Sequence, residues 1–264
     1  MPPRILRPLT LAVGALVFAA TANAAPITCQ AHSPAHRVAL LELYTSEGCS
    51  SCPPADRWLA GLQAHGFHTD RVVPLALHVD YWNYLGWEDP FAQPAFTQRQ
   101  YRYGRQLKLS TVYTPQLILG GRNFVTWHRG GLGKELVPIN KETARATLRA
   151  RLEPDTTGKL RISAHAQLDG AGSDNAAGLY VAIYERKITR DIGAGENSGK
   201  RLRHDYVARV LLGPAHPNDD LLMGIEGMID VGKDWKPADL GLVAFVQSLV
   251  SGEVLQALDL PTCK

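Results

Sequence analysis

The sequence has little net charge and no internal repeat. Its 28 lysine and arginine residues nearly balance its 25 aspartate and glutamate residues. So small an excess creates no strong electrostatic field, and we therefore expect no nucleic acid and no acidic membrane surface among its partners. A chain of 264 residues is long enough for one large domain or two small ones.

Long apolar runs are missing after the N-terminus. The N-terminus itself has a basic start (residues 1–7), an apolar stretch (residues 9–20) and the small-residue tripeptide Ala22-Asn23-Ala24. This order is typical of a secretory signal peptide, which we predict over residues 1–24. The apolar stretch is shorter than the roughly 20 residues that a membrane-spanning helix needs. We expect a periplasmic or secreted protein with no membrane span after cleavage.

Cysteine is scarce, with four residues in the whole chain. In an oxidising compartment each is a candidate for a disulfide, and four cysteines allow three pairings. Cys49 and Cys52 are close enough in sequence to pair locally. That pairing leaves Cys29 and Cys263 for a second disulfide, which we predict to be structural because it ties the two ends of the chain together.

The closely spaced pair, Cys49-Ser50-Ser51-Cys52, is the most informative motif. It follows the apolar run 38–44, a predicted buried strand, and precedes a helix-like stretch over residues 53–65. Two thiols with two residues between them can close into a disulfide ring and open again without rearranging the fold. A strand, a CxxC motif and a helix in this order are typical of a thioredoxin-like unit with redox activity.

The elements after the motif extend this pattern. We expect a strand at 72–79, a helix at 94–107, a hairpin of strands 112–119 and 123–127, and a helix at 141–152. The fold-class prediction is therefore α/β, with a thioredoxin-like domain over residues 25–152. A smaller, mostly β region packed on it is predicted over residues 153–264, with strands at 159–168, 179–187, 206–212 and 240–250. The polar segment 191–204 is expected to be a hairpin loop.

The predicted catalytic residues are Cys49, Cys52, His78 and Pro115. Cys49 is the expected nucleophile, because the first cysteine of such a turn is normally the exposed one, and Cys52 is the expected resolving thiol. The positive end of the following helix favours a thiolate on the first sulfur. Thr114-Pro115 precedes a predicted strand, at the position where thioredoxin-like folds have a cis proline that faces the cysteines. The resemblance therefore implies a cis bond here, which only X-Pro makes cheap, with Thr114 contacting substrate. The turn between the cysteines is polar, with neither the preceding Trp nor the intervening Pro of thioredoxin.

An aromatic loop follows the second predicted strand. In one interpretation Tyr81, Trp82 and Trp87 bind substrate, while His78 or Asp80 moves protons during exchange. In the other, buried aromatic rings pin the loop and His78 is satisfied by a hydrogen bond.

Several long motifs resemble those of a bacterial secreted thioredoxin-like family of unknown function. They occupy residues 42–56, 78–87, 89–91 and 113–116, with shorter pieces at 202–205 and 243–247. The resemblance covers nearly all of the chain after the signal peptide. It implies a thioredoxin-like domain that carries a CxxC motif, and it implies no particular substrate.

Three functions fit these residues. The first is an exported thiol-disulfide oxidoreductase that exchanges disulfides with protein or small-molecule thiols and needs no cofactor. The alternative is a periplasmic metal-binding module in which Cys49, Cys52 and His78 hold copper or zinc, although these are few ligands for a closed zinc site. The third is a binding protein whose cysteine pair stays oxidised and whose aromatic loop recognises a ligand.

Overall fold

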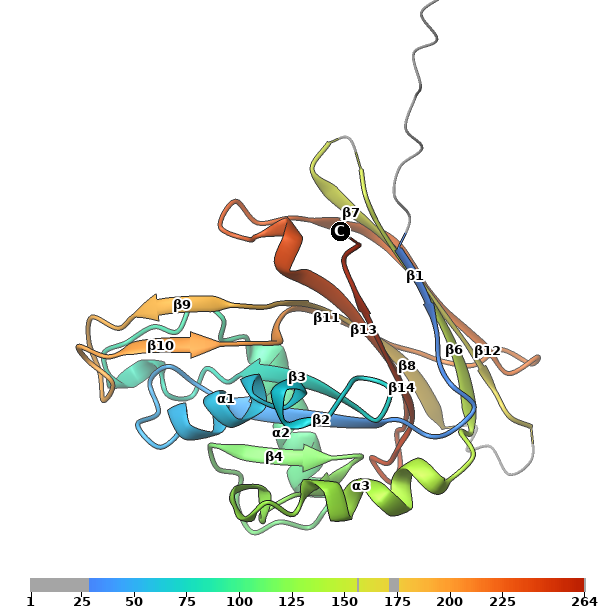
Figure 1. The fold of residues 1–264 in the computed structure, drawn as a ribbon, viewed down its shortest axis with the longest axis horizontal. Helices are drawn as coiled ribbons and strands as arrows, with labels where there is room; N and C mark the ends of the chain where they lie inside the picture. The colour runs from blue at the N-terminus through green and yellow to red at the C-terminus, as the bar shows by residue number, and fades with distance from the viewer. Residues whose placement is uncertain (1–28, 156, 171–175, 264) are drawn as a thin grey trace, which may run out of the picture.

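The computed structural model describes residues 29–155, 157–170 and 176–263. The predicted signal peptide, residues 1–24, lies outside the described residues. Within them, strands form three sheets, and helices gather at one end of the largest sheet (Figure 1).

The largest sheet has eight strands, in the order β14-β13-β8-β11-β3-β2-β4-β5. Strands β2 and β3 are parallel to each other, β11 is parallel to β3, and the other neighbours are antiparallel. Every position of β2, β3, β8 and β13 is buried. Their nearly continuous apolar sequences fit strands covered on both faces. The bounds are β2 Ala39–Thr45, β3 Val72–His78, β4 Gln116–Leu119, β5 Arg122–Asn123, β8 Ala177–Glu185, β11 Val207–Ala215, β13 Leu240–Ser248 and β14 Val254–Pro261.

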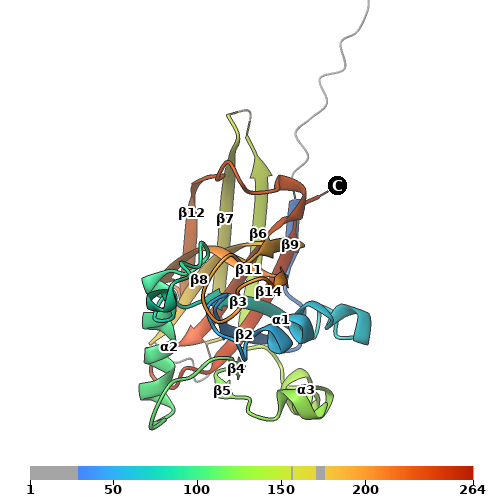
Figure 2. The ribbon, with the colours of Figure 1, turned by 90° about the vertical axis from the view of Figure 1, so that its left-hand side faces the viewer.

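The second sheet is antiparallel, with the strand order β1-β6-β7-β12. Its strands are β1 Cys29–His32, β6 Ala146–Pro154, β7 Lys159–Leu168 and β12 Leu222–Asp230; Figure 2 shows β6, β7 and β12 side by side. Buried and exposed residues alternate along β6 and β7. The buried residues form a core with apolar residues of β8, β13 and β14, and the other face meets solvent, as antiparallel sheets commonly do.

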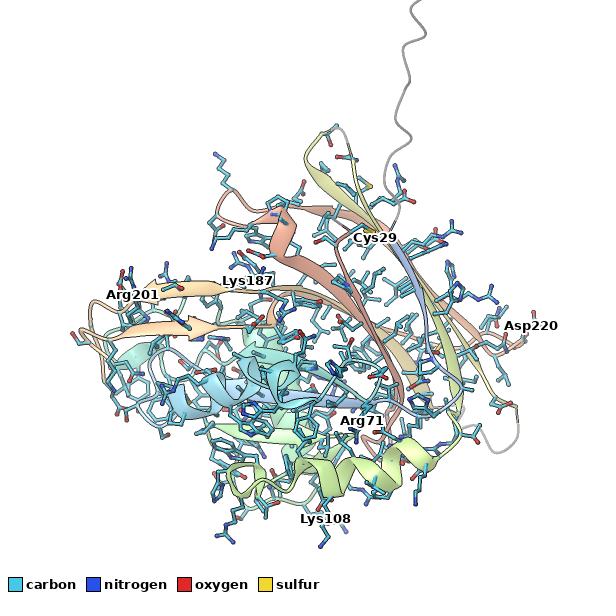
Figure 3. All side chains as sticks on the ribbon, viewed as in Figure 1. Cys29, Arg71, Lys108, Lys187, Arg201 and Asp220 are labelled. Atoms are coloured by element: carbon cyan, nitrogen blue, oxygen red, sulfur yellow. A yellow bond between two sulfur atoms is a disulfide. The ribbon has the colours of Figure 1, made fainter. Side chains whose placement is uncertain are left out.

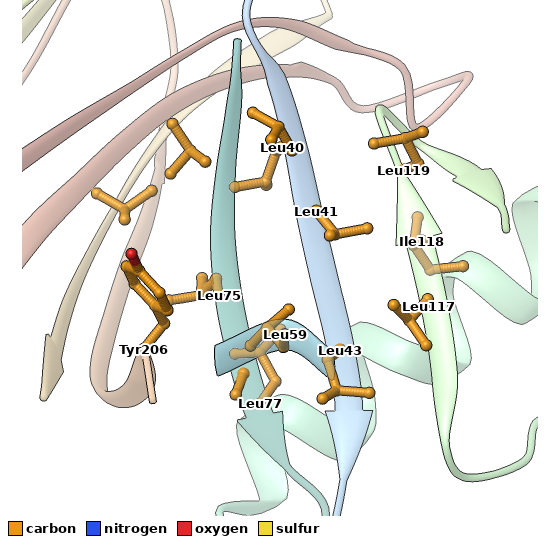
Figure 4. Close-up of a cluster of buried hydrophobic side chains, with 14 of the residues drawn as sticks. Leu40, Leu41, Leu43, Leu59, Leu75, Leu77, Leu117, Ile118, Leu119 and Tyr206 are labelled. Carbon is orange, nitrogen blue, oxygen red and sulfur yellow. The ribbon is translucent and has the colours of Figure 1, made fainter. Parts of the chain in front are cut away.

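Three α-helices surround the β2–β4 end of the large sheet: α1 Pro53–Ala60, α2 Pro94–Gln106 and α3 Leu132–Lys141. Short 3-10 turns lie at Gln63–His65, Asn83–Leu85, Trp127–Arg129 and Pro237–Asp239. Figure 4 shows Leu59 of α1 among leucines of β2 and β3, with β4 alongside. This second core fixes the end of β2 and the start of α1, between which the CxxC motif lies.

A separate two-stranded sheet is formed by β9 (Ile188–Asp191) and β10 (Arg201–His204). This hairpin connects β8 to β11, extends beyond the large sheet and places β10 against α1 (Figure 1). In Figure 3, Lys187 marks the base of this hairpin and Arg201 its outer part. The hairpin thereby brings a segment distant in sequence to the cysteines.

The predicted thioredoxin-like α/β fold is wrong, because the described chain is mostly β and its sheets cross the predicted boundary. Strands β2 to β5 are one side of the eight-stranded sheet rather than a sheet of their own. The amide of Ala76 in β3 donates to the carbonyl of Tyr206 at 2.8 Å, and Val207 of β11 pairs with Ala76. Strands β1 and β6 belong to the second sheet. Residue 152, the end of the predicted first domain, lies inside β6.

The predicted helix over residues 141–152 is also wrong. Helix α3 ends at Lys141, and residues 146–154 form β6. Ala, Arg and Leu are good helix formers, but here apolar residues alternate strictly with polar ones from Ala146 to Leu152. Because alternation places all the apolar side chains on one face of a strand, burial against the core outweighs helix propensity.

Candidate functional site

The CxxC motif lies in the turn that joins β2 to α1. Cys49 and Cys52 form a disulfide with a Cα–Cα distance of 5.4 Å, and Cys52 is the N-cap of α1. The cysteine turn, residues 46–52, is held by backbone bonds from Cys49 to Ser46 and from Cys52 to Cys49, both 3.2 Å. Neither cysteine exposes any surface. The disulfide is thus enclosed at the positive end of a helix.

Thr114 provides a hydroxyl group directed at the first cysteine. The Thr114–Pro115 peptide is cis, as predicted. Thr114 Oγ1 donates to Cys49 Sγ at 3.3 Å and accepts from Trp82 Nε1 at 2.7 Å. A tryptophan N–H can only donate, so the Thr114 hydroxyl accepts from Trp82 and keeps its own hydrogen for the sulfur.

Gly48 permits this arrangement. A Cβ atom at Gly48 would lie 3.2 Å from Trp82 Cβ, closer than nearly all contacts of real Cβ atoms. The absence of a side chain at residue 48 lets Trp82 pack directly against the cysteine turn, from which its indole reaches Thr114.

The three predicted substrate-binding aromatics are partly buried, and each is held by a hydrogen bond. Tyr81 donates to Gln100 Oε1 at 3.0 Å, and Trp87 Nε1 donates to Glu47 Oε2 at 2.8 Å. Burial raises the pKa of Tyr81 to about 12, although the bond to Gln100 opposes it. The structure brings Trp82 to Gly48 and Thr114 and Trp87 to Glu47, whereas Tyr81 bonds to Gln100 of α2. The exposed aromatic side chain of this loop is Tyr84, which is 80% exposed.

His78 is completely buried beside Asp89. Its Nδ1 donates to Asp89 Oδ2 at 2.7 Å, and that same oxygen accepts from the Glu47 amide at 2.8 Å. Burial opposes ionisation of Asp89, but His78 and these donors hold its pKa below the ordinary value. Asp80 accepts instead from Thr97 of α2. His78 therefore acts on the cysteine turn through Asp89 and the backbone of Glu47.

A second buried ionic group, which the sequence analysis missed, lies behind the cysteine turn. Glu47 Oε1 is 3.3 Å from His204 Nε2 and 3.6 Å from Arg190 Nε, and Asp56 Oδ1 is 3.9 Å from His204 Nδ1. Burial alone would lower the pKa of His204, but the neighbouring carboxylates of Asp56 and Glu47 raise it to about 10. His204 is therefore a cation at neutral pH, and it joins β10 to both sides of the CxxC motif.

The loop at the end of the β9–β10 hairpin also contacts the cysteine turn. Asn197 Nδ2 donates to the carbonyls of Glu47 and Cys49 at 2.8 and 2.9 Å, and Glu196 accepts from the Ser50 amide at 3.0 Å. The sequence analysis assigned no function to these residues. The sequence pattern that could have indicated them is the set of three glycines, Gly193, Gly195 and Gly199, on either side of the polar pair Glu196-Asn197.

The predicted structural disulfide, Cys29–Cys263, is present. It joins β1 to the segment after β14, and Cys29 is buried in the core between the second sheet and strands β8, β13 and β14 (Figure 3). Two disulfides are typical of proteins that work outside the cytoplasm.

Two further properties concern the part of the chain that the structure covers. It contains no group of three or more histidine, cysteine, aspartate or glutamate side chains arranged to hold a metal ion. None of the helices found there has the length and apolar character needed to cross a membrane.

Comparison with solved structures found two similar chains whose TM-scores exceed 0.5. A crystal structure of a protein from Agrobacterium tumefaciens is 28% identical in sequence with a TM-score of 0.60, covering 87% of this chain and 96% of that one. HBP35 of Porphyromonas gingivalis is 14% identical with a TM-score of 0.64, covering 88% of this chain and 79% of that one. The second likeness concerns the fold alone. Comparison with curated proteins found no match.

The family model described as "Protein of unknown function (DUF1223)" matches residues 40–247. This range includes the cysteine turn, the aromatic loop, Thr114 and the β9–β10 hairpin. The match confirms the expected membership of a family of unknown function, while the thioredoxin-like fold expected with it is corrected above. The chain belongs to the DUF1223 family.

Proposed function

We propose that this protein is an exported thiol-disulfide oxidoreductase in which Cys49 and Cys52 exchange disulfides with protein or small-molecule thiols. The observation that carries the proposal is the chain of donors from Trp82 Nε1 to Thr114 Oγ1 to Cys49 Sγ. A structural disulfide has no need of a hydroxyl group aligned on one of its two sulfurs.

The donor favours the reduced, ionised form of Cys49. A disulfide sulfur is a weak hydrogen-bond acceptor, whereas a thiolate accepts a charge-assisted bond that is roughly twice as strong as a neutral one. The thiolate is also the form that attacks a disulfide. The N-terminus of α1, which Cys52 caps, adds a further favourable field.

The exchange proceeds in two steps that conserve atoms and electrons. The Cys49 thiolate attacks a substrate disulfide, forms a mixed disulfide and releases one substrate thiolate. The Cys52 sulfur then attacks Cys49 Sγ and breaks the bond to the substrate sulfur. The Cys49–Cys52 disulfide forms, the second substrate sulfur leaves as a thiolate, and the proton of Cys52 passes to it. The substrate gains two electrons and the cysteine pair loses two. The reverse sequence oxidises a dithiol.

The neighbouring residues have supporting roles in this proposal. Thr114 and Pro115 lie at the Cys49 side of the turn, where a substrate chain would approach. Trp82 aligns Thr114, and Trp87 holds Glu47, so we assign both rings to positioning rather than to substrate binding. The periplasm or the extracellular medium is the proposed location, which the two disulfides and the predicted signal peptide support.

A trapping experiment tests the assignment of the two cysteines. The Cys52→Ser variant, reduced and then mixed with a disulfide-bonded peptide, should accumulate a mixed disulfide through Cys49, because no resolving thiol remains. The Cys49→Ser variant is the matched control and should accumulate none under the same conditions. Mass spectrometry identifies the linked cysteine. Equal trapping by the two variants would refute the assignment of Cys49 as nucleophile.

A further inference from the structure

The Cys49–Cys52 disulfide cannot be reached while the surrounding groups stay where they are. Both cysteines are fully enclosed, although Ser50 and Ser51 between them are exposed. Exchange requires a substrate sulfur to come in line with Cys49 Sγ. Some group in contact with the cysteine turn must therefore move before the reaction.

The loop over residues 193–199, which we name the hairpin loop, is the group best placed to move. It carries Asn197, which binds two carbonyls of the cysteine turn, and Glu196, which binds the Ser50 amide. These contacts are side-chain hydrogen bonds to backbone, and Glu196 is exposed whereas Asn197 is fully buried. Breaking the Asn197 bonds would free the backbone of both Glu47, two residues before the motif, and Cys49, its first cysteine.

The base of the same hairpin is anchored more strongly. His204 of β10 and Arg190 of β9 face Glu47, a completely buried carboxylate. Removing one partner from a buried group of ions is costly, because the remaining charge is left uncompensated. The strands are therefore fixed to the protein, and movement is confined to the loop beyond them.

The composition of the hairpin loop suits such a movement. Gly193, Gly195 and Gly199 stand at its start, middle and end. Gly195 and Gly199 have φ values of +70° and +76°, which glycine adopts freely and other residues do not. A Cβ atom at Gly195 would lie 3.0 Å from Trp87 Cβ. Glycine thus serves both the close packing of the loop on Trp87 and its freedom to change conformation.

Asn197 is oriented by a third contact. Lys200 Nζ donates to Asn197 Oδ1 at 2.9 Å, so the amide nitrogen is the atom turned toward the two carbonyls. Its two N–H groups are both used, one for Glu47 and one for Cys49. No rotation of the side chain would keep all three bonds.

We propose that Asn197 is a positioning residue that closes the hairpin loop over the cysteine turn, and that release of Asn197 admits the substrate sulfur to Cys49. This inference rests on the proposed function. Asn197 acts through the backbone of Glu47 and Cys49 and does not contact the sulfur. The loop selects substrates by requiring them to displace it.

Reduction kinetics of the two disulfides in one molecule test the proposal. In the Asn197→Ala variant, dithiothreitol should reduce Cys49–Cys52 about tenfold faster than in the wild type, a factor that corresponds to about 1.4 kcal/mol and to the net value of one or two hydrogen bonds. The rate for Cys29–Cys263 should not change, because that disulfide is remote from the loop. Time-resolved alkylation with mass spectrometry follows both disulfides.

Two more variants keep the test independent of folding defects. Glu196→Ala removes an exposed side chain and should accelerate both the reduction of Cys49–Cys52 and hydrogen exchange of the Ser50 amide. Asn218→Ala is the matched control, because Asn218 caps an exposed turn on another part of the molecule, and it should change neither rate.

The outcomes separate this inference from the proposed function. If both Asn197→Ala and Glu196→Ala leave the reduction rate of Cys49–Cys52 unchanged while the disulfide titrates reversibly, the hairpin loop is no cover, and exchange stands without it. If no variant can be reduced short of unfolding, the proposed function and the inference fail together.

Discussion

At the scale of single residues, Thr114 provides the hydroxyl group on which the proposed chemistry of Cys49 depends. Its hydroxyl is fixed by Trp82 and directed at Cys49 Sγ. The sequence predicted that Thr114 and the cis proline face the cysteines, because the order of strands and helices placed them there. It did not predict the bond from Trp82, since nothing in a sequence shows that two loops 32 residues apart meet.

We expect the reduced Thr114→Val variant to be alkylated at Cys49 about tenfold more slowly than wild type at neutral pH. Valine has the shape of threonine but donates no hydrogen bond, and a lost bond to a charged group is worth about 1.5 kcal/mol or more. The pH at which alkylation by iodoacetamide reaches half its maximal rate should move upward. Trp82→Phe should shift it in the same direction by less. An unchanged pH profile in Thr114→Val would show that the hydroxyl does not act on the thiolate.

His204 should make the folded protein lose stability as the pH becomes alkaline. Its pKa is raised in the folded protein to about 10, compared with about 6.5 in an unfolded chain. A raised pKa means that the folded state binds the proton more tightly, so the stabilisation is fully present below about pH 6.5 and is lost as pH rises through about 10.

In urea unfolding, the wild type should therefore lose more free energy of unfolding between pH 6.5 and pH 10 than His204→Gln does. At pH 6 the variant should be less stable than wild type by about 3 kcal/mol, because Glu47 and Asp56 lose their buried cationic partner. Parallel pH curves for the two proteins would exclude a charged His204 as the source of the dependence.

At the scale of elements, the sequence predicted several local patterns well, but α3, β12 and β14 were not expected, and composition gave one helix that is a strand. Strands β2 and β3 and helices α1 and α2 were expected within a few residues of their bounds, because continuous apolar runs and helical spacing are local signals. Residues 141–152 were expected to form a helix from their Ala, Arg and Leu content, although the alternation that begins at Ala146 is that of a strand. Segment 191–204 was expected to be a hairpin loop. Strand β9 ends at its first residue, Asp191, and its last four residues form β10.

The strand assignment of β6 has a direct consequence for two adjacent residues. Leu148 is 1% exposed and faces the core between the sheets, whereas Arg149 points to solvent. Leu148→Ala should lower the free energy of unfolding by about 3 kcal/mol, because it leaves a cavity in a packed core. Arg149→Ala should lower it by less than about 0.5 kcal/mol, as surface substitutions usually do. Urea unfolding of both variants measures this, and equal effects would contradict the strand register.

At the scale of the whole molecule, the site depends on contacts that no local pattern encodes. Residues 38–65 and 78–116 provide the cysteines, His78, Trp82 and Thr114, and the sequence identified this half of the site. The other half consists of Asn197 and His204. These residues lie near the cysteines because β11 pairs with β3 and the β9–β10 hairpin lies against α1. A prediction of two successive domains, one thioredoxin-like, therefore missed both the continuous sheet and the residues that it carries to the cysteines.

The proposed function requires the enclosed cysteine pair to be redox-active, which a redox titration in defined thiol buffers measures. The protein is equilibrated at each potential, its free thiols are alkylated, and mass spectrometry maps the modified cysteines while circular dichroism follows the fold. We predict that Cys49 and Cys52 titrate reversibly as a pair in the folded protein while Cys29 and Cys263 stay joined. Reduction of Cys49–Cys52 only together with unfolding would show that the disulfide is structural and would contradict the proposed function.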